Sequence, residues 1–309
     1  MGELSKLTGE FGENIVLEFI KLIGWIRPIS NIDIDCVFPE KHRSDGAKRN
    51  RSTHGIDFVV TQIDNLLEPD TQDTLVISAK YREYGKDVQK DTRKYIEELL
   101  QTMECVVEDE KIGGQRIDQG IRKVEYTGVL FSLSPTEDIN RDIISDLKEF
   151  RAIEGAPYPV YIVDNYRISF IIRVLDFARR EFENGVIHYF YINTGFNYVN
   201  NENSGPAMPI QYINSSVLPL KVIKDNEEIL VLAMIEGFSE STFRGDVSRA
   251  QSLTHGWGNR IVIAYPDYQA RKHQQIVQMV LQNFADTKFA EKVHVRCFDW
   301  NFRSLEVEE

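Results

Sequence analysis

The stretch Leu75-Val-Ile-Ser-Ala-Lys-Tyr-Arg-Glu83 decides the fold, because it begins as a buried strand and ends in polar and charged side chains. Upstream, His54-Gly-Ile-Asp-Phe-Val-Val60 has a similar apolar character. The polar, turn-rich segment between them, residues 64–73, predicts that the two strands form a hairpin. Side chains alternate between the two faces of a strand, so pairing of these strands can place Asp57 and Lys80 side by side at one end of the sheet.

Acidic side chains gather near this hairpin. Asp57 lies on an otherwise apolar strand, where a carboxylate is costly unless it is paired or holds a cation. Residues 10–23 have the apolar spacing of an amphipathic helix and supply Glu10 and Glu13. Carboxylate oxygens bind Mg²⁺ and leave positions for water and substrate. A nearby ammonium orients the attacking water and stabilises the developing negative charge. Such a set suits metal-dependent cleavage of phosphodiester bonds.

These pieces resemble the PD-(D/E)XK nuclease superfamily, which includes restriction endonucleases, Holliday-junction resolvases and Mrr-like enzymes. The matching stretches are Gly9-Glu-Phe-Gly-Glu13 at the head of a helix, Gly55-Ile-Asp57, and Ser78-Ala-Lys80 followed by a helix. The resemblance implies an α/β fold with a restriction-endonuclease-like mixed sheet flanked by helices.

The resemblance also implies roles for individual residues. In that superfamily the helix glutamate and the hairpin aspartate bind metal, and the lysine is catalytic. On this chain those roles fall on Glu13, Asp57 and Lys80. We expect Mg²⁺ as the cofactor, with Mn²⁺ able to substitute, and DNA as the substrate. The overall makeup is similar to bacterial anti-phage defence nucleases, which implies a homo-oligomer or a hetero-oligomer with a companion defence protein.

Position 78 departs from the superfamily, whose members carry an acidic metal ligand two residues before the lysine. Ser78 is neutral, and a hydroxyl is a poor Mg²⁺ ligand beside a carboxylate. One outcome is a one-metal site on Glu13, Asp57 and the carbonyl of Ala79. Another is a degenerate nuclease subunit that binds DNA or scaffolds a partner nuclease without cutting.

The sequence leaves the roles of several further residues near the site undecided. Asp87 or Asp91, on the helix after the hairpin, could replace the missing acid, and Gln89 lies on the same helix. His54 could contact a phosphate or act as a base near the metal, or it could be a turn histidine before Gly55.

Residues 41–51 form a basic segment close before Asp57. The segment holds one aspartate and five basic side chains, Lys41, Arg43, Lys48, Arg49 and Arg51. Its position predicts contact with DNA phosphates, although a charge run is also typical of a solvated loop.

Composition bounds the other properties. The chain has 309 residues, of which 42% are hydrophobic and 27% charged, as in ordinary globular proteins. Its net charge of -12 repels polyanions, so DNA contacts must be local. Because the sequence lacks a long apolar run and a signal peptide, we expect a cytoplasmic protein without membrane contact. The three cysteines, Cys36, Cys105 and Cys297, are far apart, which argues against a disulfide framework or a thiolate zinc site.

Beyond the hairpin, strand and helix patterns alternate. The polar segment 200–206, with its Gly-Pro pair, predicts a linker between a nuclease domain over residues 1–200 and a second, smaller α/β domain over 207–309 that recognises substrate or a partner. Helices are expected over residues 87–106, 135–150, 166–183, 240–253 and 269–284, and strands over 31–38, 124–133, 159–163, 187–192, 218–223, 229–235, 260–265 and 293–298.

Overall fold

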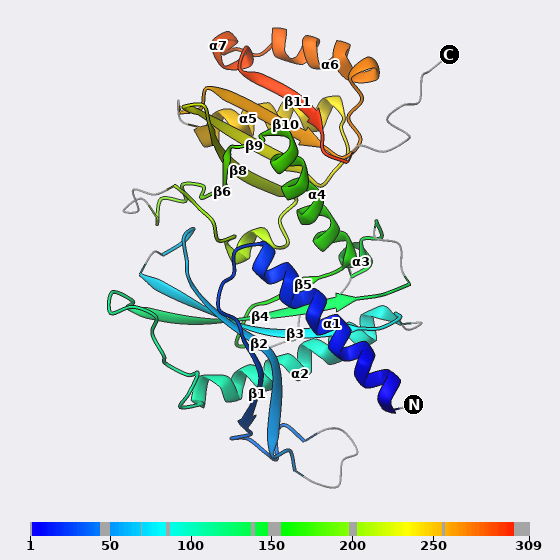
Figure 1. The fold of residues 1–309 in the computed structure, drawn as a ribbon, viewed down its shortest axis with the longest axis vertical. Coiled ribbons are helices and arrows are strands. Elements are labelled where there is room, and N and C mark those ends of the chain that lie inside the picture. The colour runs from blue at the N-terminus through cyan, green and yellow to red at the C-terminus, as the bar shows by residue number, and fades with distance from the viewer. Residues whose placement is uncertain are drawn as a thin grey trace. The chain divides into compact units, whose positions relative to one another are not determined.

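A computed structural model of the chain describes residues 2–43, 50–68, 70–84, 87–136, 140–147, 156–197, 203–254 and 257–299, with the side chains of residues 2–6 and 146 outside the description. The chain divides into two compact units, Met1–Ser169 and Phe170–Glu309 (Figure 1). Each unit is built on one mixed sheet with helices.

The N-terminal unit contains a five-stranded sheet in the order β1-β2-β3-β4-β5. The strands β1, β2 and β3 are antiparallel, whereas β4 and β5 continue parallel to β3. Its elements are α1 (Gly2–Leu22), β1 (Ile29–Asp35), β2 (Thr53–Ile63), β3 (Thr71–Tyr81), α2 (Val88–Glu108), β4 (Lys123–Leu133), α3 (Ile143–Asp146), β5 (Val160–Val163) and the start of α4 (Asn165–Glu181).

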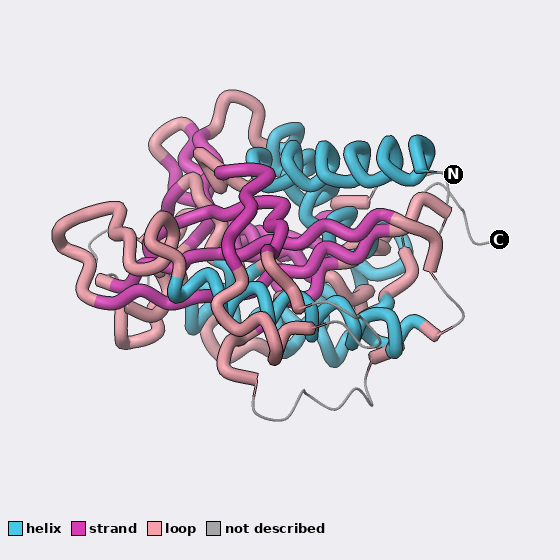
Figure 2. Tube along the Cα trace, turned by 90° about the horizontal axis from the view of Figure 1, so that it is seen from below, coloured by secondary structure: helices cyan, strands magenta, loops and turns pink. Residues whose placement is uncertain are grey.

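Helices cover both faces of this sheet (Figure 2). Gly128 on β4 faces α2, since a Cβ there would lie 2.9 Å from the Met103 sulfur. Gly128 pairs with Val76, so Val76 faces α2 as well. Tyr81 follows Val76 on β3 by an odd number of residues, so its side chain points to the other face of the sheet. There its Cβ lies against Gly12 of α1. The sheet is therefore a central layer between α1 and α2.

Local sequence explains where both helices begin or end. Gly24 has a φ of +84°, and the N–H groups of Gly24 and Trp25 bond to the carbonyls of Lys21 and Ile20 at 3.0 and 2.9 Å, which terminates α1. The α2 helix begins after Asp87, whose carboxylate accepts a hydrogen bond from the N–H of Lys90 at 3.0 Å. Both ends agree with the sequence expectations.

The C-terminal unit contains a six-stranded sheet in the order β11-β10-β9-β8-β6-β7. The strands β9, β10 and β11 are parallel, and β6, β7 and β8 add antiparallel pairs. Its further elements are β6 (Val186–Phe190), β7 (Ser204–Gly205), a 3₁₀ turn (Ile210–Tyr212), β8 (Val217–Lys224), β9 (Glu227–Met234), α5 (Glu240–Thr254), β10 (Arg260–Tyr265), α6 (Ala270–Gln282), α7 (Thr287–Ala290) and β11 (Val293–Cys297).

The expected fold class is confirmed, while one detail differs. The compact units meet within α4, and β6 pairs with β8 in the second sheet; the expected domain division at residues 200–206 stays a prediction. The expected helix over 135–150 is short: among its described residues only Ile143–Asp146 are helical.

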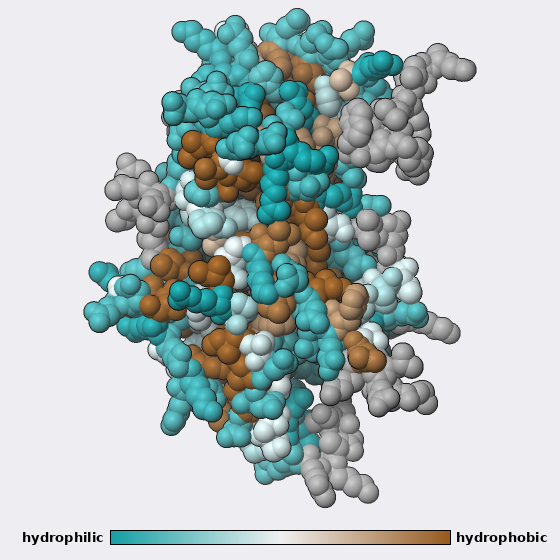
Figure 3. Space-filling view, viewed as in Figure 1, coloured by the Kyte–Doolittle hydropathy of each residue, from teal (hydrophilic) through white to brown (hydrophobic). Residues whose placement is uncertain are grey.

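The face drawn in Figure 3 is mainly hydrophilic, with apolar side chains gathered in patches between the charged ones. Leu7 and Phe11 on α1 belong to the exposed apolar side chains, at 62% and 57% exposure. Among the described residues, no helix combines the length and apolar character needed to cross a membrane.

Candidate active site

The strands β2 and β3 separate at one end of the hairpin. Their paired register runs from Ile63 opposite Gln72 to Phe58 opposite Ile77 and stops there. Beyond Phe58, β2 continues to pair with β1 through Ile56 and Gly55. The loss of ladder contacts opens a fork between β2 and β3, and Asp57 lies at its base.

Asp57 bridges this fork with its side chain. One carboxylate oxygen, Oδ2, accepts a hydrogen bond from the backbone N–H of Ala79 at 2.6 Å. This charge-assisted contact replaces a ladder hydrogen bond and fixes the aspartate one residue from Lys80 along β3. The short contact explains how a carboxylate is accommodated on an apolar strand.

Glu13 on α1 belongs to the same electrostatic neighbourhood. Partial burial raises the pKa of Glu13, the negative charges of Asp57 and Glu10 raise it further, and the positive charge of Lys80 opposes them. The predicted acids and the lysine therefore lie close enough to Glu13 for their charges to change its pKa. Three carboxylates near one another repel, which is an arrangement that a bound cation stabilises.

Glycine brings α1 to the sheet at this level. A Cβ on Gly12 would collide with the Cβ of Tyr81, so the absence of a side chain allows the close approach of helix and strand. Phe11 packs beside the same tyrosine, with 5.6 Å between ring centroids. Glu13 follows directly, and its position depends on this contact.

Lys80 reaches the site from the α2 face of β3. Its ammonium lies 5.5 Å from the centroid of the Tyr95 ring on α2, and the guanidinium of Arg82 lies 4.8 Å from the same centroid. Cation–π contact with Tyr95 therefore holds two positive charges beside the end of β3. Arg82 is further paired with Asp91 at 2.8 Å.

The structure also places the accessory residues around Ser78. Ser78 and Lys80 line a small pocket of about 100 Å³ together with Glu98 of α2. Asp91 pairs with Arg82, Asp87 caps α2, and Gln89 is exposed in the first turn of that helix. Glu98 is therefore an acid that the structure places in the same pocket as Ser78.

The basic segment is partly fastened to α2. Lys41 pairs with Glu104 at 2.5 Å, and Arg51 donates to the Gln101 side chain at 3.2 Å. Arg43 is exposed. Lys48 and Arg49 lie outside the described residues.

His54 lies away from any exposed phosphate position. Only 1% of the residue is exposed, its Nε2 lies 3.2 Å from Nδ1 of His42, and its Nδ1 lies 3.3 Å from the Thr102 hydroxyl. Burial and the nearby positive charge of Arg51 lower the pKa of His54 to about 4. The side chain is a buried, neutral imidazole.

A family model described as the GAPS4 protein PD-(D/E)XK nuclease domain matches residues 1–167, just over half of the chain. The chain belongs to this nuclease family. The matched range ends two residues before the boundary of the N-terminal unit at Ser169, so this unit is the PD-(D/E)XK nuclease domain. No curated protein sequence matches the chain.

Sequence reasoning gave little weight to several residues that the nuclease domain brings to the site. Tyr95 and Glu98 lie on α2 three positions apart, which places both on one helix face toward Lys80. Glu10 precedes Glu13 by the same spacing on α1. Helical spacing of polar side chains next to apolar ones was the signal available for both pairs.

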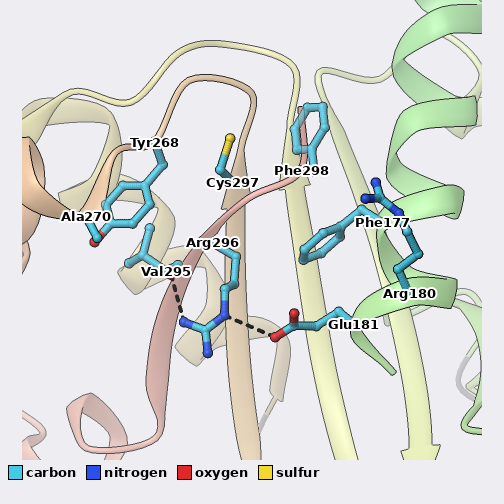
Figure 4. Close-up of a pocket in the computed structure, with 9 residues that line it drawn as sticks. All are labelled: Phe177, Arg180, Glu181, Tyr268, Ala270, Val295, Arg296, Cys297 and Phe298. Atoms are coloured by element: carbon cyan, nitrogen blue, oxygen red, sulfur yellow. Dashed lines mark hydrogen bonds and ion pairs between the residues drawn. The ribbon is translucent and has the colours of Figure 1, made fainter. Parts of the chain in front are cut away.

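The C-terminal unit has a pocket of its own, with a volume of about 380 Å³ (Figure 4). Aromatic side chains of Phe177, Tyr268 and Phe298 line it. Arg296 crosses the pocket to Glu181, with the two charged groups 3.0 Å apart. Its lining combines aromatic surface with charges that are already paired.

Proposed function

We propose that the nuclease domain is a metal-dependent DNA endonuclease whose active site lies at the fork between β2 and β3. Glu13 and Asp57 are the metal-binding carboxylates, and Lys80 is the catalytic ammonium. The observation that carries this proposal is the meeting of three separate elements at the fork. Asp57 on β2 accepts a hydrogen bond from the N–H of Ala79, the residue before Lys80 on β3, and Glu13 follows Gly12, where α1 packs on Tyr81.

The donor set fits a hard divalent cation. Carboxylate oxygens are the preferred ligands of Mg²⁺ and Mn²⁺, and mutual repulsion among Glu10, Glu13 and Asp57 favours a positive charge between them. When bound, such an ion supplies a polarised water and stabilises charge on the phosphate. Ala79 contributes its N–H to Asp57 and leaves its carbonyl as the further oxygen expected from the sequence.

The chain's own residues orient the reaction. Asp57 is held by the Ala79 N–H, which binds Oδ2 and orients the carboxylate within the fork. Lys80, steadied by the Tyr95 ring, supplies a positive charge beside the phosphate and can hold the attacking water by hydrogen bonding. Lys41, Arg43 and Arg51 offer phosphate contacts on the α2 side, provided that DNA competes with Glu104 and Gln101 for two of them.

Ser78 favours a second candidate function. A neutral hydroxyl at this position removes one metal ligand expected in the superfamily, and Asp87 and Asp91 have other partners. A domain with a weakened metal site would bind DNA or scaffold a partner nuclease. The two functions differ in one measurable property, cleavage that depends on Lys80.

A plasmid-nicking assay separates them. The full chain is incubated with supercoiled DNA and Mg²⁺ or Mn²⁺, and compared with Asp57→Asn, Lys80→Ala and the matched control Lys90→Ala, an exposed lysine on α2. The endonuclease proposal expects nicking by the wild type and by Lys90→Ala, with loss in the two site variants.

Equal nicking by all four proteins would assign the activity to a contaminant and remove these residues from the site. DNA binding without nicking by any of them, also in the presence of a co-purifying partner, would favour the scaffold function. Binding is measured by fluorescence anisotropy with labelled duplex DNA.

The biological setting is proposed on the same basis. A role in bacterial anti-phage defence follows from the family, whose description names the GAPS4 protein. The exposed Leu7 and Phe11 on α1 support assembly with another subunit, a companion protein or a second copy. Because a net charge of -12 repels DNA, a companion subunit would also help this chain to approach its substrate. We place the protein in the cytoplasm, where its DNA substrate is found, and assign substrate or partner recognition to the C-terminal unit.

A further inference from the structure

Two cysteines and two histidines gather on the α2 side of the nuclease domain, apart from the acidic site. Cys36 directly follows β1, His42 lies in the turn after it, His54 is on β2 and Cys105 is on α2. Their candidate ligand atoms all lie within 4.8 Å of one another. Cys105 and both histidines are buried, with exposures of 0–1%.

The distances match a tetrahedral metal site. Zinc bonds of ~2.3 Å to sulfur and ~2.05 Å to nitrogen at tetrahedral angles separate two nitrogens by about 3.3 Å and a nitrogen from a sulfur by about 3.6 Å. Nδ1 of His42 lies 3.2 Å from Nε2 of His54. The same Nδ1 lies 3.5 Å from the Cys36 sulfur and 3.4 Å from the Cys105 sulfur.

Outer hydrogen bonds define which nitrogen of each histidine carries a proton. Nε2 of His42 lies 3.0 Å from a carboxylate oxygen of Glu104, an acceptor, so this nitrogen is the donor. The Thr102 hydroxyl donates to the Glu98 carbonyl at 2.9 Å. It must therefore accept the 3.3 Å hydrogen bond from Nδ1 of His54.

In the neutral rings both inward nitrogens carry lone pairs. Nδ1 of His42 and Nε2 of His54 then lie 3.2 Å apart with no proton between them, so their partners inside the cluster are the two cysteine side chains or a shared cation. Outer carboxylate and hydroxyl partners on the second ring nitrogen are typical of metal-bound histidines.

We propose that Cys36, His42, His54 and Cys105 form a structural zinc site of the nuclease domain. On binding, two S–Zn and two N–Zn bonds form, and the two thiol protons leave to water. Two thiolates and two neutral imidazoles cancel the charge of Zn²⁺, which suits a buried site. Four protein ligands close the coordination, so this ion ties β1, β2 and α2 together and takes no substrate.

Zinc fits the Cys/His cluster better than Mg²⁺ or Mn²⁺, the ions proposed for the acidic site. Thiolate and imidazole are ligands for zinc, whereas Mg²⁺ and Mn²⁺ prefer oxygen. The two centres are thus chemically distinct within one domain. Sequence spacing argued against a thiolate site because the ligands come from separate elements, so no short Cys-x-x-Cys or His-x-x-x-His pattern is present.

The test measures metal in the full chain, produced without a histidine tag and dialysed with Zn²⁺ alone. Mass spectrometry of the metal content should find about one zinc per chain in the wild type. The Cys36→Ser and Cys105→Ser variants should retain at least tenfold less zinc, while the control Cys297→Ser, in the C-terminal unit, retains the wild-type amount. Asp57→Asn should also keep its zinc, which separates this site from the proposed active site.

A second measurement uses the wild type alone, so it gives a result even if the variants fail to fold. Cobalt(II) added to the wild type in place of zinc should give intense d–d bands of tetrahedral coordination and thiolate charge-transfer absorption in the near ultraviolet. A folded wild type that takes up no zinc and gives no such bands would overturn the proposal. Equal zinc in wild type and folded Cys36→Ser would do the same, as would a Cys36–Cys105 disulfide in the protein isolated under reducing conditions.

Discussion

The acidic site and the Cys/His cluster of the nuclease domain differ in burial and in the way the protein holds their side chains. Asp57 has a firm partner in the Ala79 N–H, while partial burial and nearby like charges raise the pKa of Glu13. Cys105 and both histidines of the cluster are buried, and each histidine has an outer hydrogen-bond partner that fixes its ring.

This difference fits the two uses of a metal that we propose. A partly open set of carboxylates suits an ion that must also contact water and substrate. A closed set of four soft ligands holds an ion for stability alone.

Glu13→Gln should have the largest effect. Removal of one of the proposed carboxylate ligands should weaken metal binding and lower plasmid nicking on the order of 10³-fold, or about 4 kcal/mol of transition-state stabilisation. Zinc content should be unchanged. Glu18→Gln, an exposed glutamate on the same helix, is the control. Full activity of Glu13→Gln would show that α1 provides no ligand.

Asp73→Asn concerns a buried carboxyl at the far end of β3 that, among the described residues, has no cation paired with it. Burial and the charges of Asp64 and Glu125 raise its pKa to about 7, so the folded state binds a proton more tightly than the unfolded state. Its contribution to stability is complete below pH 3.8 and is lost as the pH rises through about 7.

The variant should therefore gain stability over the wild type by about 3 kcal/mol between pH 5 and pH 8.5. Urea unfolding at both pH values measures it, with the exposed Asp35→Asn as the control. A pH-independent difference between Asp73→Asn and wild type would mean that Asp73 does not titrate in this range.

Gly12→Ala should cost about 2 kcal/mol of stability, because the new methyl group collides with the Cβ of Tyr81 and pushes α1 from the sheet. Activity should fall with it, since Glu13 moves, while zinc is retained. Gly9→Ala is a matched control: nothing lies within 4 Å of a methyl group added at that position, and alanine favours a helix. Similar stabilities in thermal unfolding would refute the close approach of helix and strand.

Ser78→Asp should have the smallest effect. The added carboxylate restores an acid two residues before Lys80, and we expect the Mg²⁺ concentration for half-maximal nicking to fall about tenfold or less. Ser78→Asn, of the same shape without the charge, is the control. An equal fall in the half-maximal Mg²⁺ concentration in both variants, or a rise in that concentration for Ser78→Asp, would indicate that the side chain at position 78 does not reach the metal.

The nuclease fold could be predicted from the sequence because its signals are local. Apolar alternation marks β2 and β3, helical spacing and Gly24 mark α1, and the order of Glu13, Asp57 and Lys80 agrees with one superfamily. The pairing in the second sheet could not be predicted this way. Residues 200–206 are typical of a linker, yet β6, which precedes them, pairs with β8, which follows them, and pairing partners are not local.

The sequence by itself determined the elements and the residue types that could bind a hard cation, since periodicity and side-chain chemistry are written in short stretches. Only the tertiary structure decided which of these groups interact. The fork that seats Asp57, the glycine contact that places Glu13 and the meeting of Cys36 with Cys105 all depend on how strands pair and helices pack. Those contacts join residues far apart in the chain, so no local pattern specifies them.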